Sequence, residues 1–215
     1  MRDYSRHVTS IGGLDVLFVM ATEQEYGAHL RARIDPLVCG VGPVEAATVT
    51  TAALGTLAHT GRRPHLVCSL GSAGSRNLDH CGIYQAASIS YRDMDASAFG
   101  FEKGVTPFLG LPATVVLPHR IEGVAAASLA TGASVVSGAA YDSITADMVD
   151  MESFAVLRAA QLFGIPLVGL RGISDGRTDV ATLEDWTEYL AIIDEKLAMA
   201  IDLLAAQASH GTFTV

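Results

Sequence analysis

Residues 15–21 read Asp-Val-Leu-Phe-Val-Met-Ala, and this stretch decides the fold class. The run follows Gly13 and ends where polar residues begin at Thr22. An apolar run of this length without alternation predicts a strand that is covered on both faces. Strands of this kind are typical of largely parallel sheets with helices on each side. The stretch therefore favours an α/β fold.

Similar runs and helical patterns follow along the chain. Further strands are predicted at residues 36–42, 65–70, 84–91, 113–117, 133–136 and 167–173. Helices are predicted at residues 43–59 and 151–163, and a last helix begins near Thr182 and Asp185 with an apolar stripe from Trp186 to Leu204. We expect a single domain over residues 1–215, with a flexible N-terminus at residues 1–13. Its predicted architecture is a three-layer α/β/α fold around a mixed, largely parallel, twisted sheet.

Composition narrows the classes of function. The chain of 215 residues is 50% hydrophobic, and 14 Lys and Arg against 23 Asp and Glu give a net charge of −9. Such a chain can bury a core, and its acidity argues against nucleic-acid and anionic-membrane partners. We find neither an apolar run of the ~20 residues that a spanning helix needs nor a secretory signal. Three cysteines without a CxxC motif predict free thiols in a reducing cytoplasm.

Polar residues follow four of the predicted strands. These segments are 22–25 with Glu25, the glycine-rich 71–75, 150–152 with Glu152, and 174–176 with Asp175. Ligands of α/β sheets bind at the carboxyl ends of strands, so the segments are candidates for chemistry. Each also has a plain structural interpretation, as acids at a helix start or a tight turn. A P-loop, paired metal-ligand spacing of histidines and a Gly-x-Ser-x-Gly elbow are all missing from the sequence.

The order of these segments carries a resemblance to a known family. The sequence resembles the nucleoside phosphorylase/nucleosidase superfamily from Val16 to Ala205, and most closely its 5′-methylthioadenosine/S-adenosylhomocysteine nucleosidases. The matching blocks are residues 21–25, 40–47, 71–74 and 93–102, followed by the pair 149–152 and 171–175. The resemblance implies hydrolysis of the N-glycosidic bond between adenine and a 5′-thio-substituted ribose, with water as the nucleophile. It implies no cofactor and no metal.

The resemblance also assigns roles to residues of this chain. Asp175 resembles the general acid that protonates N7 of the leaving adenine, and Ser174 resembles the residue that holds it. Glu25 resembles the general base. Glu152 resembles the ligand of the ribose hydroxyls, with Met151 against the sugar. The remaining substrate-binding residues that it implies are Ser72, Ala73, Gly74, Val41, Tyr141 stacked on adenine, Asp142 at the base edge, and Phe99, Phe101 and Pro107 from the neighbouring subunit of a homodimer.

Three other functions stay open beside this one. A purine nucleoside phosphorylase of the same fold would need cationic phosphate ligands, and here residues 21–23 and 68–70 supply none. Futalosine hydrolase or another nucleosidase would share the acids. A non-catalytic nucleoside-binding protein would not need Glu25. The chain also departs from the family pattern: the segments after Glu25 and Tyr141 are short, Ala139 replaces an Asp, Arg92 replaces a His, and Thr22 replaces an apolar residue.

Overall fold

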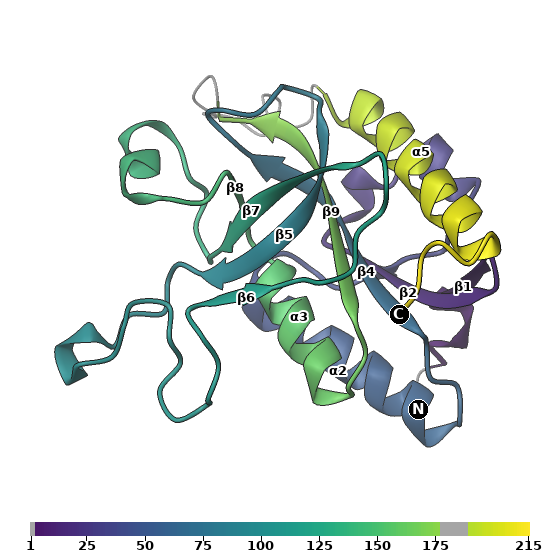
Figure 1. Ribbon diagram of the computed structural model, residues 1–215, viewed down its shortest axis with the longest axis horizontal. Helices are drawn as coiled ribbons and strands as arrows, with labels where there is room; N and C mark the ends of the chain where they lie inside the picture. The colour runs from purple at the N-terminus through teal and green to yellow at the C-terminus, as the bar shows by residue number, and fades with distance from the viewer. Residues whose placement is uncertain (1–2, 177–188) are drawn as a thin grey trace.

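The computed structural model describes residues 3–176 and 189–215, and within them one mixed sheet separates two helical layers (Figure 1). The strands are β1 (Val8–Ile11), β2 (Leu14–Met20), β3 (Leu37–Val38), β4 (Leu66–Gly74), β5 (Ile83–Tyr91), β6 (Thr114–Val116), β7 (Ala125–Thr131), β8 (Met148–Asp150) and β9 (Leu167–Asp175). The α-helices are α1 (Ala28–Arg31), α2 (Pro43–His59), α3 (Ser153–Leu162) and α5 (Leu190–Ser209). Short 3-10 turns are η1 (Ser5–His7), η2 (Glu23–Glu25), η3 (Ser97–Phe99) and η4 (Gly138–Ser143).

The sheet curls until five of its strands close into a ring. β4 pairs in parallel with β9 and antiparallel with β8, β9 pairs antiparallel with β5, and β5 and β8 both pair in parallel with β7. Outside the ring, β2 pairs with β4, β3 and β1, while β6 pairs with β5. The predicted α/β/α architecture with a mixed sheet is confirmed. The ring brings the ends of β4, β8 and β9 to one place.

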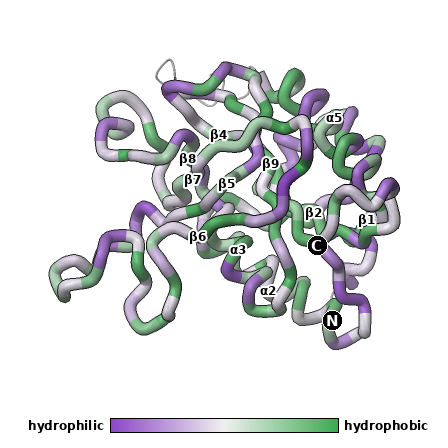
Figure 2. Tube along the Cα trace, viewed as in Figure 1, coloured by the Kyte–Doolittle hydropathy of each residue, from purple (hydrophilic) through white to green (hydrophobic). Residues whose placement is uncertain are grey.

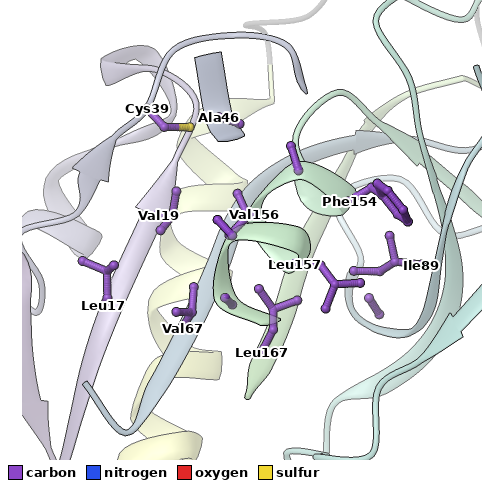
Figure 3. Close-up of a cluster of buried hydrophobic side chains, with 14 of the residues drawn as sticks. Leu17, Val19, Cys39, Ala46, Val67, Ile89, Phe154, Val156, Leu157 and Leu167 are labelled. Carbon is purple, nitrogen blue, oxygen red and sulfur yellow. The ribbon is translucent and has the colours of Figure 1, made fainter. Parts of the chain in front are cut away.

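Two apolar cores lie on the two faces of the sheet. On one face, α2 and α3 pack on the strands through residues that include Leu17, Val67 and Leu157 (Figure 3). On the other face, α5 packs through Ile193, Leu197, Ile201 and Leu204. Figure 2 shows hydrophobic and hydrophilic residues alternating along α5, as a helix with one buried side requires. The predicted apolar stripe of this helix is confirmed over these residues, while its predicted start at Thr182, Asp185 and Trp186 lies outside the described residues.

The strands and helices that the sequence marks most clearly are confirmed. Strands β2, β4, β5 and β9 overlap the predicted ranges 15–21, 65–70, 84–91 and 167–173, and α2 has the predicted bounds of 43–59. Helix α3 lies inside the predicted range of 151–163. Of the predicted strand at residues 36–42, only β3 is extended and paired. In the described part of the chain, no helix combines the length and apolarity that crossing a membrane requires.

Two predictions of local structure are wrong. The flexible N-terminus was expected over residues 1–13, but Val8–Ile11 forms β1 and pairs along its length with β2. A strand was expected at 133–136, but the strand is β7, at residues 125–131. The side chains of β7 are small, mostly Ala, and Ala is not enriched in strands, so the sequence did not predict this strand. The strand that was expected to end before Met151 and Glu152 is β8, which is only three residues long. The glycine-rich segment after the predicted strand 65–70, for which a tight turn was one interpretation, continues β4 as far as Gly74, with a register shift at its end.

A buried carboxylate ties α5 to the segment that follows β2. The Asp194 side chain is 3% exposed, and its oxygens accept hydrogen bonds from the backbone N–H groups of Gly27 (3.0 Å), His29 (2.9 Å) and Leu30 (3.2 Å). These are the free N–H groups at the start of α1, which otherwise have no partner inside so short a helix. Asp194 therefore fixes the chain that leads away from Glu25.

We expect Asp194→Ala to lower the free energy of unfolding, because each buried N–H that loses its partner costs about 1–3 kcal/mol. Asp194→Asn keeps one acceptor oxygen and should lose less. Urea unfolding of the two variants measures the difference. Equal stability of Asp194→Ala and the unmodified chain would contradict this role.

Candidate active site

A pocket of about 570 Å³ opens where the ring strands end. Its walls come from the ends of β4 and β8, the last residue of β9, the residues just before α3, and the segments after β2, β3 and β7. The predicted site residues on these walls are Glu25, Val41, Ser72, Ala73, Gly74, Met151, Glu152 and Asp175. Residues from far apart in the sequence thus meet, because parallel strands end at the same edge of a sheet.

Glu25 lies in η2, directly after β2, and its side chain is held by β4. Its Oε1 accepts hydrogen bonds from the backbone N–H and the hydroxyl of Ser72, at 2.6 and 2.7 Å. The residue is 7% exposed. Burial raises the pKa of Glu25, while the Ser72 hydrogen bonds and the charge of Arg171 oppose that rise. Glu25 also lines the pocket, so its carboxyl group is within reach of a molecule bound there.

Glu152 lies at the junction of β8 and α3, as the sequence indicated. Its Oε1 accepts a hydrogen bond from the backbone N–H of Gly42, at 2.8 Å. Burial, followed by the nearby charge of Asp150, raises the pKa of Glu152 to about 7. The carboxyl group is therefore poised between its neutral and ionised forms near neutral pH.

Asp175 ends β9 and is separate from the other two acids. Its Oδ1 accepts a hydrogen bond from the Ser174 hydroxyl at 2.6 Å, which is the pairing that the sequence analysis expected. Burial raises the pKa of Asp175. The hydrogen bond from Ser174 and the charge of His80 oppose this rise but do not cancel it. A carboxyl group with a raised pKa holds its proton at higher pH, as a general acid must.

A buried ion pair lies directly behind the pocket, and the sequence analysis missed it. Arg171, in the middle of β9, is 2% exposed, and its Nη2 lies 2.8 Å from Asp150 Oδ2. The same guanidinium donates hydrogen bonds to the hydroxyls of Ser69 (2.8 Å) and Ser153 (2.6 Å). The signal was available, because a charged residue inside the apolar run 167–173 demands a buried partner.

Six of the predicted binding residues do not lie on the pocket wall, and one of them is Ser174, whose hydroxyl bonds Asp175. Tyr141 packs in a small cluster with Val136 and Val149. Asp142 forms an ion pair with Arg76 at 2.6 Å. Phe99, Phe101 and Pro107 lie on the segment between β5 and β6, which extends away from the sheet (Figure 1). Phe99 is 85% exposed.

Arg92 is a wall residue to which the sequence analysis gave no role. It lines the pocket together with Ser134, Val135 and Val136. Its guanidinium bonds to Asp93 Oδ1 at 3.2 Å and to the Ser134 hydroxyl at 3.1 Å. Arg92 follows β5 and Ser134 follows β7, and the two residues meet only because these strands pair. The sequence alone did not indicate this pairing. In the residues that the structure describes, no group of three or more His, Cys, Asp or Glu could hold a metal ion.

Comparison with known proteins now identifies the family. Residues 36–206 match the Phosphorylase superfamily. The chain belongs to this superfamily. It is 29% identical over 192 residues to a 5′-methylthioadenosine/S-adenosylhomocysteine nucleosidase of Actinobacillus succinogenes, covering 79% of each chain. It is 28% identical over 186 residues to the nucleosidase of the same name from Bacillus pumilus, covering 76% of this chain and 78% of that one.

Solved structures of superfamily members share the fold. A 5′-methylthioadenosine/S-adenosylhomocysteine nucleosidase of Colwellia psychrerythraea, in complex with adenine, superposes with a TM-score of 0.73 at 21% identity, over 91% of this chain and 96% of that chain. A futalosine hydrolase mutant of Helicobacter pylori superposes with a TM-score of 0.73 at 18% identity, over 89% of this chain and 98% of that chain. At such low identities the likeness establishes the superfamily fold alone.

We expect Arg171→Met to destabilise the protein by about 3–5 kcal/mol, because it leaves the buried Asp150 carboxylate without its cation. The matched control is Arg31→Met, which removes an exposed ion pair with Glu23 at 3.0 Å and should cost at most about 1 kcal/mol. Urea unfolding compares the two. Equal losses would show that the buried pair is not the stronger constraint.

Proposed function

We propose that this protein hydrolyses the N-glycosidic bond of adenine nucleosides with a 5′-thio substituent, such as methylthioadenosine and S-adenosylhomocysteine, releasing adenine and the 5′-substituted ribose. The observation that carries the proposal is that Glu25, Glu152 and Asp175 line one pocket while each carboxyl group has a different partner. Membership of the superfamily and the names of the similar nucleosidases support it.

Asp175 is the general acid of the proposed reaction. Adenine is a poor leaving group until it is protonated, so a group that donates a proton to N7 lowers the barrier to bond cleavage. Burial raises the pKa of Asp175, which favours the protonated form that donates. Ser174 holds Oδ1, which leaves Oδ2 as the oxygen that would carry the proton to the base.

Glu25 is the general base that activates water. A cavity of about 10 Å³ adjoins the pocket and is lined by Glu25, Glu152, Arg171 and Ser72, among others. This volume is close to that needed for one water, and the wall is polar enough to bind it. A water held there meets the Glu25 carboxylate on one side and the sugar on the other. The transition state is oxocarbenium-like, and nearby carboxylates stabilise its positive charge.

Glu152 is the ligand of the ribose. A carboxylate accepts hydrogen bonds from two neighbouring hydroxyls, and the Gly42 N–H fixes Glu152 Oε1 for that purpose. Met151, which precedes it on the same wall, supplies an apolar surface for the sugar. The ribose then lies between the base at Asp175 and the water at Glu25.

The acids also favour hydrolysis over phosphorolysis and over simple binding. Glu25 and Glu152 together repel a phosphate dianion, and the neighbouring cation, Arg171, is already paired with Asp150. A protein that only bound nucleosides would need no base beside the sugar. The free thiols Cys39, Cys68 and Cys81 support a reducing, cytoplasmic location.

A homodimer would complete the pocket of this enzyme. The segment between β5 and β6 carries Phe99, Phe101 and Pro107 away from its own subunit, where two large side chains, Phe99 and Phe108, are mostly exposed. Exposed apolar residues grouped in this way are typical of an interface. We propose that they close the 5′-thio end of the neighbouring subunit's pocket.

We expect Asp175→Asn to lower kcat for adenine release from methylthioadenosine by about 10²–10⁴-fold, because the amide has no proton to transfer to N7. Asp202→Asn, which disrupts only the exposed pair of Asp202 with Arg33, is the matched control and should retain normal kcat. Near-normal turnover by Asp175→Asn would refute the assignment of the acid.

We expect the rate of adenine release to be independent of phosphate, and Glu25→Gln to abolish most turnover while nucleoside binding stays similar. The glutamine retains acceptor oxygen for Ser72 but cannot take a proton from water. Product analysis in buffers with and without phosphate makes the test. If a sugar 1-phosphate were the main product, the protein would be a phosphorylase and the proposed hydrolysis would be wrong.

A further inference from the structure

Three segments converge on the last residue of β4. A Cβ atom at Gly74 would collide with the Tyr141 hydroxyl of η4 and would lie 2.8 Å from Asp175 Oδ2 of β9. The hydroxyl and the carboxyl oxygen therefore approach the same point, and only a glycine at position 74 leaves room for both. This convergence places a phenol beside the group that we assign as the general acid.

The Tyr141 hydroxyl is buried and has no hydrogen-bond partner among the described residues. Tyr141 as a whole is 8% exposed, so bulk solvent does not reach most of the side chain. A buried hydroxyl without a partner carries a free-energy cost, and proteins retain few such groups. An acceptor that gains negative charge during the reaction would remove this cost.

Asp175 offers one oxygen for that purpose. The Ser174 hydroxyl donates to Oδ1, while Oδ2 is the oxygen near Gly74 and the Tyr141 side chain. Burial and the charge of Asp175 both raise the pKa of Tyr141, so its hydroxyl keeps its proton and remains a donor. The phenol can thus donate to Oδ2 but does not compete to protonate the base.

Neighbouring charges hold the Tyr141 side chain in this place. The Arg76 guanidinium lies over the Tyr141 ring, 5.2 Å from its centroid, and pairs with Asp142 at 2.6 Å. It also donates to the carbonyl oxygen of Gly138, the first residue of η4. Arg76 therefore holds η4 in place through Gly138, Asp142 and the Tyr141 ring.

We propose that Tyr141 is a positioning residue for the general acid, whose hydroxyl donates a hydrogen bond to Asp175 Oδ2 as that oxygen gives its proton to the leaving base. The inference rests on the proposed function and deepens it. The proton moves from Asp175 to N7 of adenine, the electron pair of the N-glycosidic bond goes to the base, and Tyr141 keeps its own proton. A donor strengthens its bond as Oδ2 becomes anionic, so it stabilises the transition state more than the bound substrate.

The first test measures the Asp175 carboxyl group directly. The pKa of Asp175 is followed by carbon NMR of aspartate-labelled protein, with its signal assigned through Asp175→Asn. A donor to the carboxylate lowers the pKa, so Tyr141→Phe should raise it. His80, whose ring nitrogen lies 2.7 Å from the Ser174 carbonyl oxygen, and the cations Arg76 and Arg92 act on this group or on Tyr141 and are unchanged in the variant.

The matched control is Tyr84→Phe, which removes another tyrosine hydroxyl that accepts from the backbone N–H of Asp79 at 3.2 Å. This variant should leave the pKa of Asp175 unchanged. An Asp175 pKa that stays constant or falls in Tyr141→Phe overturns the proposal. Because this measurement needs no substrate, it decides the contact even if the unmodified protein releases no adenine, an outcome that would refute the proposed function instead.

The second test separates catalysis from binding. Tyr141→Phe should lower kcat for adenine release by about ten- to a hundredfold, the loss expected for one hydrogen bond to a charged group, with KM little changed. Adding Tyr141→Phe to Asp175→Asn should cause no further loss, because the two side chains then act as one unit. An unchanged kcat, or losses that multiply in the double variant, would overturn the proposal.

Discussion

The ion pair between Arg171 and Asp150 is the constraint on which the site depends. Both side chains are buried, so each charge is tolerable only while the other stays in place. Their partners come from two strands of the ring and from a helix: Ser69 from β4, Thr131 from β7 and Ser153 from α3. Because Thr131 bonds Asp150 Oδ1 at 2.6 Å and the Ser153 N–H bonds Oδ2 at 3.0 Å, few hydrogen-bonding positions remain unfilled. The pair therefore sets how β8 and β9 lie beside β4, and so where their ends deliver Glu152 and Asp175.

The charges of Arg171 and Asp150 act on two of the three acids in the pocket and not on the third. Glu25 and Glu152 face Arg171 and also feel the charge of Asp150, so attraction and repulsion both act on their pKa values. Burial nevertheless dominates, and it raises both. Asp175 stands apart from the pair, and burial opposed by Ser174 and His80 sets its pKa. A reaction that needs a proton donor at one end of a substrate and negative charge at the other would use this separation.

The sequence analysis succeeded where structure is local. Residues 15–21 and 167–173 are largely apolar runs, and Pro43 marks the first turn of α2, so each of these elements can be predicted from its own residues. Strand β7 could not, because its small residues gain their strand character from pairing with β5. The acids were predicted by family resemblance and their position after strands. Their surroundings were not, since the contact of Arg171 with Asp150 and of Tyr141 with the Gly74 region depends on closure of the ring.

Closure of the ring also explains why the pocket is left open on one side. The strands deliver acids and glycines to the inner wall, whereas Val41 and Val135 line the pocket and remain exposed. The segment between β5 and β6 cannot cover them, because it extends away from its own sheet (Figure 1). Burying one large apolar side chain contributes about 1.5–3 kcal/mol, so Phe99 and Phe108 favour association strongly once a complementary surface is present. The proposed dimer would then supply the apolar wall for a 5′-thio group, while the ring of each subunit supplies the chemistry.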